Sequence, residues 1–145
     1  ENASAILVLL EREKTLAEGA GAVAVAALLQ QKVRVEGKCT VALVCGGNID
    51  VSLLAKIIER GLVKDNRRMR LRIHLTDRPG ALHGLTKILA EQQANIVETN
   101  YDRTYYGVNL GETAIDMTLE TRGAAHVDTI LKALCQGDYR HERIE

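Results

Sequence analysis

The segment "DRPGALHGLTKILA", residues 77–90, decides the fold of the second half of the chain. Pro79 suits the first turn of a helix because its φ is fixed and its missing N–H would have had no partner there. Asp77 is placed to cap this helix, and Gly80 leaves the first backbone amides uncovered by a side chain. The segment therefore predicts a helix from residue 79 whose N-terminus can hold a carboxylate, although a plain strand-to-helix turn would use the same residues.

The residues on either side of this helix follow strand patterns. The preceding "MRLRIHL" (69–75) alternates strictly between apolar and polar side chains, which predicts a strand with one buried and one wet face. Further strands are predicted for "NIVETNYDR" (95–103) and "TAIDMTLET" (113–121), joined by a loop containing Gly107 and Gly111.

A second amphipathic helix and a terminal strand, "YRHERIE" (139–145), complete the predicted order βαββαβ. This is the ferredoxin-like arrangement, in which two helices cover one side of a sheet. The apolar stripes of the two predicted helices consist of Leu82, Leu85, Ile88 and Leu89, and of Val127, Ile130, Leu131 and Leu134.

The first half of the chain has a different pattern, and we place the boundary between residues 66 and 67. It predicts a helix (2–13), a buried helix (18–31), the strand "CTVALV" (39–44), the glycine turn "CGGN" and a helix capped by Asp50. This alternation is typical of an α/β layer whose sheet lies mostly elsewhere, because a single strand has no partner.

Composition excludes several classes of protein. The 145 residues carry 19 basic and 19 acidic side chains, so there is no basic field to attract nucleic acid or anionic lipid. The longest apolar run, residues 20–29, is too short to span a bilayer. Cys39, Cys45 and Cys135 are irregularly spaced and predict free thiols in a reducing cytoplasm. The start at Glu1, inside a helical pattern, indicates a piece of a longer protein.

Residues 67–145 resemble the ACT domain, a small amino-acid-binding regulatory module, through "DRPGALHGLTKILAEQQANIV" (77–97). The resemblance implies side-by-side homodimers, or a tetramer, with isoleucine or valine as the expected effector. One departure is Gln93, where the family usually ends the helix with glycine. The residues implied to bind the effector are Asp77, Arg78, Pro79, Gly80, Ala81 and Leu82, with Asn95 and Ile96 facing them across a dimer interface.

Residues 1–66 are similar to the C-terminal end of the catalytic domain of threonine ammonia-lyases, through "TLAEGAGAVAVAALL" (15–29) and "VALVCGGNIDVSLLAKIIERGL" (41–62). These are pyridoxal 5'-phosphate enzymes of fold type II, the tryptophan synthase β-like fold. The whole chain is thus expected to be an α/β remnant of such a domain followed by a ferredoxin-like ACT domain. The residues implied to lie near the cofactor are Cys45, Gly46, Gly47, Asn48, Glu18 and Gly19.

The resemblance implies that Cys45 lies beside the pyridine nitrogen, where a thiol would temper the ring as an electron sink for β-elimination. By itself, a cysteine at a strand end is more often a small buried apolar residue. None of the seven lysines is a credible Schiff-base residue, and the four histidines show no metal-ligand spacing. We expect no catalytic residue and no metal site in these residues, which should be inactive alone.

Three functions remain open from the sequence. The first is the regulatory end of an enzyme that converts L-threonine to 2-oxobutanoate and ammonia, with regulation passing through residues 62–68. The second is a free-standing amino-acid-binding or dimerisation module. The third is part of a related serine dehydratase or serine racemase, which shares the Cys-Gly-Gly-Asn turn.

Overall fold

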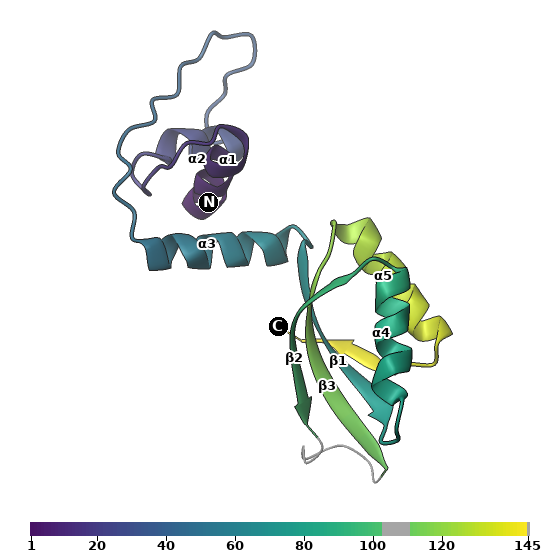
Figure 1. Cartoon of the computed structure of the whole chain (residues 1–145). Helices are drawn as coiled ribbons and strands as arrows, with labels where there is room; N and C mark the ends of the chain where they lie inside the picture. The colour runs from purple at the N-terminus through teal and green to yellow at the C-terminus, as the bar shows by residue number, and fades with distance from the viewer. Residues whose placement is uncertain (103–110, 145) are drawn as a thin grey trace. The chain divides into compact units, whose positions relative to one another are not determined.

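The computed structural model describes residues 1–102 and 111–144, which form two compact units, Glu1–Leu62 and Val63–Glu145 (Figure 1). The boundary between the units falls inside helix α3 (Val51–Lys64). The loop predicted around Gly107 lies outside the described residues, as does Arg103 at the predicted end of a strand.

The second unit is an antiparallel sheet with two helices on one face, and it confirms the predicted βαββαβ order (Figure 1). The sheet has the order β2-β3-β1-β4. Its strands are β1 (Arg68–Thr76), β2 (Asn95–Asp102), β3 (Glu112–Glu120) and β4 (His141–Arg143). Helix α4 (Ala81–Glu91) connects β1 to β2, and helix α5 (Ala124–Gln136) connects β3 to β4.

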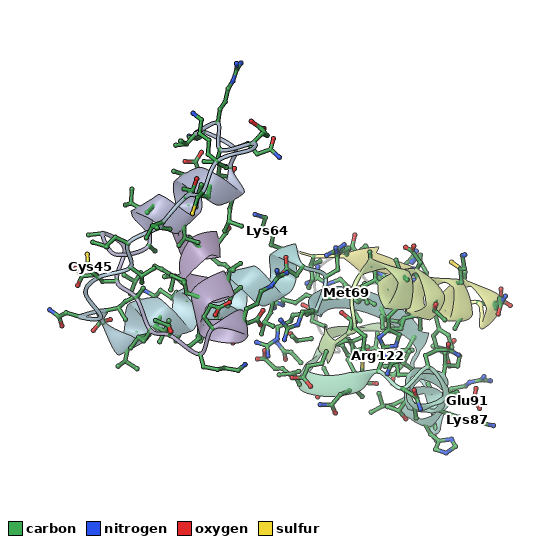
Figure 2. All side chains as sticks on the ribbon, turned by 90° about the horizontal axis from the view of Figure 1, so that it is seen from above. Cys45, Lys64, Met69, Lys87, Glu91 and Arg122 are labelled. Atoms are coloured by element: carbon green, nitrogen blue, oxygen red, sulfur yellow. The ribbon has the colours of Figure 1, made fainter. Side chains whose placement is uncertain are left out.

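The core of this unit lies between the sheet and the two helices, as the alternation in β1 predicts. Every second residue of β1 is buried, and the helical stripes cover them. The buried side chains of these elements are Met69, Leu71, Ile73, Leu75, Leu85, Leu89, Val127, Ile130 and Leu134. Leu82, predicted to belong to the same stripe, is instead 41% exposed at the N-terminal end of α4. Lys87 and Glu91 lie on the outward side of that helix, 3.9 Å apart (Figure 2).

The first unit contains α1 (Asn2–Arg12), α2 (Val23–Leu29) and most of α3. The predicted cap is confirmed, because Asp50 Oδ1 accepts a hydrogen bond from the amide of Leu53 at 2.9 Å. Helix α2 is shorter than the predicted 18–31. Residues 19–22 form a turn against the Cys45–Gly46 segment instead, where the amide of Glu18 donates to the carbonyl of Gly46 at 3.1 Å.

The predicted strand 39–44 is wrong. These residues have no regular secondary structure, and Val41 and Leu43 are 84% and 73% exposed. A strand needs a neighbour to pair its backbone N–H and C=O groups. All four strands of the described sheet belong to the second unit, so the apolar sequence finds no partner in the first.

Candidate functional site

The connection between β1 and α4 is a tight turn rather than a first helical turn. The amide of Ala81 donates to the carbonyl of Arg78 at 3.2 Å, and Gly80 has φ 85° and ψ −8°. These values match the third position of a type II turn, whose second position favours proline. Pro79 therefore precedes the helix, contrary to the sequence prediction, because its fixed φ also suits the turn.

Asp77 is not the cap of α4, which is a second correction to the sequence prediction. The N-cap is Gly80, which has no side chain to accept from the first amides. Asp77 is held at the end of the sheet, where its amide donates to the carbonyl of Gly111 at 2.9 Å. The N-terminus of α4 thus keeps the partial positive charge of its first amides without a capping side chain.

Gly80 is required for its backbone conformation and not for lack of room. A Cβ added at this position would meet no atom within 4 Å. A φ of 85° is nevertheless strained for a residue with a side chain. The sequence analysis explained Gly80 by its missing side chain alone. The positive φ is the reason that the sequence analysis did not identify.

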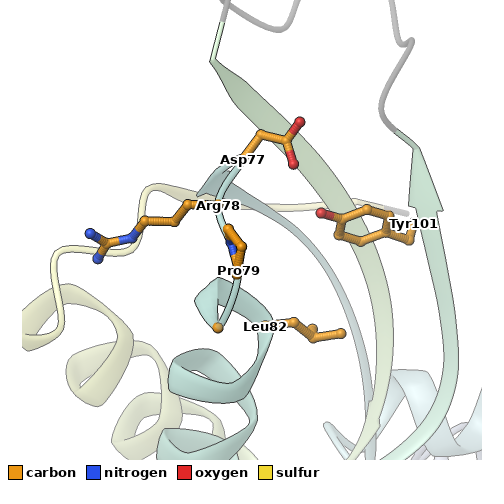
Figure 3. Close-up of a pocket in the computed structure, with 6 residues that line it drawn as sticks. Asp77, Arg78, Pro79, Leu82 and Tyr101 are labelled. Atoms are coloured by element: carbon orange, nitrogen blue, oxygen red, sulfur yellow. The ribbon is translucent and has the colours of Figure 1, made fainter.

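A hollow of about 390 Å³ lies beside this turn, lined by Asp77, Arg78, Pro79, Gly80, Leu82 and Tyr101 (Figure 3). Five of the eight predicted effector residues are thus brought together in one place. Ala81 does not line the hollow and packs against the core instead. A volume of this size is in the range of small-molecule sites.

The side chains around the hollow separate into polar and apolar groups. The carboxylate of Asp77 lies on the same side of the turn as the ring of Tyr101, and Leu82 lies below that ring (Figure 3). The guanidinium of Arg78 extends away from Leu82 and Tyr101. Near the apolar side chains, the acidic group is therefore Asp77, and the basic group of Arg78 lies on the other side of the turn.

Asn95 and Ile96 lie at the far end of the sheet from this hollow. Asn95 pairs with Glu120, which pairs with Arg68 at the start of β1, whereas Asp77 follows the end of β1. A single chain does not bring these two predicted residues to the other five. Their predicted place across a dimer interface stays a prediction.

Tyr101 is the lining residue that the sequence analysis missed. A β-bulge between Ile96 and Glu98 adds one residue to β2. Counting every second residue from Ile96 puts Tyr101 on the outer face, but the bulge moves it to the face covered by the helices. Tyr101 pairs there with Ile115, a core residue.

The residues predicted to lie near a cofactor belong to two segments of the first unit that contact each other. A Cβ added at Gly46 would come 2.6 Å from Glu18 Oε1, and one at Gly21 would come 1.8 Å from the carbonyl oxygen of Cys45. The two segments are therefore in close contact, and Gly46 has φ 79°. Cys45 is exposed, as Figure 2 shows at the edge of its loop. Gly47 and Asn48 follow it in the same exposed segment, and Gly19 belongs to the turn that follows Glu18.

Metal-binding and membrane-spanning features are considered for residues 1–102 and 111–144, which the structure describes. Within them, no three or more histidine, cysteine, aspartate or glutamate side chains are grouped so as to hold a metal ion. None of their helices combines the length and the apolar character needed to cross a membrane.

Comparison with known proteins gives a family and several relatives. A family model described as the ACT domain matches residues 64–138. An L-threonine ammonia-lyase of Geobacter sulfurreducens is 44% identical over 134 residues, which are 92% of this chain and 33% of that protein. One of Thermotoga maritima is 44% identical over 139 residues, which are 96% of this chain and 34% of that protein.

A third relative is the L-threonine dehydratase biosynthetic IlvA of Staphylococcus epidermidis, 34% identical over 98 residues, which are 68% of this chain and 23% of that protein. The chain thus spans about a third of the length of the first two relatives and less of the third. With the first two, the similarity covers nearly the whole chain and therefore includes both units.

Proposed function

The chain belongs to the ACT-domain family, and from this premise we propose that residues 63–145 bind an amino-acid effector in the hollow beside Pro79. ACT domains bind amino-acid effectors and commonly form dimers. The observation that carries the proposal is the hollow itself, which combines an uncapped helix N-terminus, an acidic side chain and two apolar side chains.

Each part of a free amino acid has a counterpart in this hollow. The first amides of α4 suit the α-carboxylate, since the start of a helix attracts anions. The carboxylate of Asp77 suits the α-ammonium group, and Leu82 and Tyr101 suit an apolar side chain. This division of charge favours isoleucine or valine over acidic, basic or strongly polar amino acids.

We propose that the whole protein is an L-threonine ammonia-lyase, which releases 2-oxobutanoate and ammonia from L-threonine in isoleucine biosynthesis. The 44% identity to two such enzymes supports this proposal because it extends through both units. The exposed Val41 and Leu43 also support it, since uncovered apolar surface favours burial against a larger domain.

Residues 1–66 would then form one side of a pyridoxal 5'-phosphate site. The Glu18–Gly19 turn and the Cys45–Asn48 segment would line that site, with open space beside Gly19 and an exposed thiol at Cys45, whereas the side chain of Glu18 fills the space beside Gly46. When bound, this cofactor supplies an electron sink for elimination. All seven lysines are exposed, and none is proposed as the Schiff-base residue. Residues 1–145 alone are therefore proposed to be inactive.

Regulation would come from a difference in effector affinity between two arrangements of the whole protein. Such coupling typically amounts to about 1–3 kcal/mol. The proposed dimer, or a tetramer built from it, would place Asn95 and Ile96 of one chain near the hollow of the other. The position of β2 at the edge of the described sheet supports pairing between chains, because edge strands can add a neighbouring strand.

A calorimetric titration of the chain with each of the twenty amino acids tests this function. We expect isoleucine or valine to bind and to raise the melting temperature. Gly80→Asp should abolish binding, because its carboxylate would repel that of the ligand. Gly37→Asp is the matched control, since Gly37 also has positive φ (70°) and open space around it, but lies in the first unit. No binding by the unmodified chain, or equal loss in both variants, would contradict the proposal.

A further inference from the structure

Leu82 and Tyr101 are two partly exposed apolar side chains that line the hollow, with Leu82 below the ring of Tyr101. They come from α4 and β2, and they are 41% and 40% exposed (Figure 3). The neighbouring side chains on this side of the sheet, such as Leu75 and Ile115, are 3% and 1% exposed. Two large side chains thus remain partly exposed beside the buried core.

The backbone directs Tyr101 to this place. Tyr101 pairs with Ile115, and directly paired residues of antiparallel strands have their side chains on the same face. The bulge before Glu98 is the feature that produces this register. Without it, the ring would lie on the outer, charged face of the sheet, and Leu82 would face no aromatic side chain.

An exposed aromatic ring opposite an exposed leucine is unfavourable in water, because apolar area gains free energy when it is covered. Asp77 and the start of α4 supply the polar groups of the same hollow, with the carboxylate of Asp77 on the same side of the turn as the ring. A ligand with charged groups at one end and an apolar side chain at the other would cover both surfaces at once.

We infer that Tyr101 determines which amino-acid side chains the hollow accepts, with its ring as one wall of an apolar subsite and Leu82 as the other. The inference rests on the proposed effector function and adds the residue that sets specificity. On this inference the ring shortens the apolar subsite, so that branched aliphatic side chains bind in preference to a benzyl group. One methylene in an apolar pocket commonly changes affinity about 10-fold or more.

Removal of the ring should change the order of affinities. Tyr101→Ala opens the volume of the ring, so the preference for isoleucine over phenylalanine should fall at least 10-fold. Tyr101→Phe keeps the ring and should leave that ratio within about 2-fold of the original. Val63→Ala is the matched control, because Val63 is also an exposed apolar residue of the second unit, at 48%, but does not line the hollow.

The measurement is calorimetric titration of the full chain and its three variants with valine, isoleucine, leucine and phenylalanine. Circular dichroism of each variant verifies the fold, and Tyr101→Leu replaces Tyr101→Ala if the latter does not fold. The inference is supported if the ratio of isoleucine to phenylalanine affinity changes in Tyr101→Ala, or in Tyr101→Leu where that variant is used. The ratio must stay unchanged in Tyr101→Phe and in the control variant.

Two results would overturn the inference while leaving an effector site in place. One is an unchanged isoleucine-to-phenylalanine ratio when the ring is removed. The other is tighter binding of a polar amino acid, such as serine, by the unmodified chain. Failure of every amino acid to bind the unmodified chain would overturn the proposed function itself, so the two failures are distinct.

Discussion

Arg72 donates two hydrogen bonds to Asp116, one from Nε to Oδ1 at 2.7 Å and one from Nη2 to Oδ2 at 2.8 Å. The two residues are direct cross-strand partners on β1 and β3. Their side chains are 22% and 21% exposed, so water screens the pair only in part. Paired hydrogen bonds between charged groups are among the stronger polar contacts, and this one joins the two central strands on the face opposite the helices.

This pair predicts a particular dependence of stability on pH. The hydrogen bond from Arg72 lowers the pKa of Asp116 and outweighs the opposing effect of burial. A carboxyl group whose pKa is lower in the folded state adds stability above its unfolded pKa of about 3.9. That stability is lost as the pH falls through the lower folded pKa. The free energy of unfolding should therefore decline below about pH 4, with no contribution from Asp116 to any change above it.

Asp116→Asn should lower the free energy of unfolding at pH 7 by about 1–3 kcal/mol, because Arg72 loses a charged partner. The loss should be smaller at pH 3, where the unmodified carboxyl group is itself becoming protonated. Urea denaturation at the two pH values measures both effects. Glu98→Gln, an exposed residue of β2, is the control and should change little. Equal losses at pH 7 and pH 3 would show that the charge of Asp116 is not the cause.

At the C-terminal end of α4, a substitution is predicted to raise the free energy of unfolding. Gln93 has φ 56°, and the amide of Ala94 donates to the carbonyl of Leu89 at 3.0 Å, which closes the helix in a left-handed cap. Glycine adopts this conformation without the steric cost that glutamine pays. Gln93→Gly should therefore raise the free energy of unfolding by about 0.5–1 kcal/mol. Thermal denaturation measures this change in stability. Destabilisation by Gln93→Gly would contradict the left-handed cap at Gln93.

Ala90→Gly is the control for that substitution, since Ala90 is exposed in the last turns of the same helix. Glycine within a helix costs about 1 kcal/mol relative to alanine. A newly introduced glycine should thus stabilise the protein at position 93 and destabilise it at position 90. This contrast separates the backbone conformation of Gln93 from any general effect of adding glycine.

Elements with a clear hydrophobic periodicity could be predicted from the sequence, and β1 of the second unit is an example. Strict alternation in residues 69–75 fixed which face of β1 is buried, and Asp50 was identifiable as a cap from its type and position. These features depend on neighbours in the sequence. The hollow was predictable to the same extent, because most of its lining comes from the single segment 77–82.

The errors have a common physical cause, which is that they depend on distant residues. A bulge can be recognised only by comparison with the partner strand. Counting residues along the sequence therefore could not show on which face of the sheet Tyr101 lies. The apolar pattern of residues 39–44 is typical of a strand, but no strand of the first unit pairs with it. Pro79 and Asp77 suit both a type II turn and a first helical turn, and only the conformation of Gly80 distinguishes them.

The separate core of the second unit predicts that residues 63–145 fold without the first. The core cluster of this unit draws all of its buried residues from β1 and the elements after it. The shortened chain should unfold in one cooperative transition and be monomeric or dimeric. Residues 1–62 alone should associate, because they expose Val41, Leu43 and other apolar side chains. Light scattering and thermal denaturation of the two pieces test this, and loss of cooperativity in residues 63–145 would contradict it.

Asn66 holds the start of the second unit through hydrogen bonds from its backbone and its side chain. Its carbonyl accepts hydrogen bonds from Thr121 Oγ1 at 2.5 Å and from the amide of Gly123 at 3.1 Å. Its Oδ1 accepts from Arg143 Nη2 at 3.1 Å, and its φ is 53°, a conformation that asparagine tolerates better than most residues.

Asn66→Ala removes both the side-chain contact and the tolerance for positive φ, so it should cost about 1–2 kcal/mol of unfolding free energy. Asn66→Gly loses only the exposed contact with Arg143 and should cost less than half as much. Urea denaturation of both variants measures the difference. Because the backbone carbonyl is retained in each, its two hydrogen bonds cancel in the comparison. Equal losses of unfolding free energy in the two variants would mean that asparagine is favoured at position 66 by its contact with Arg143 and not by its backbone conformation.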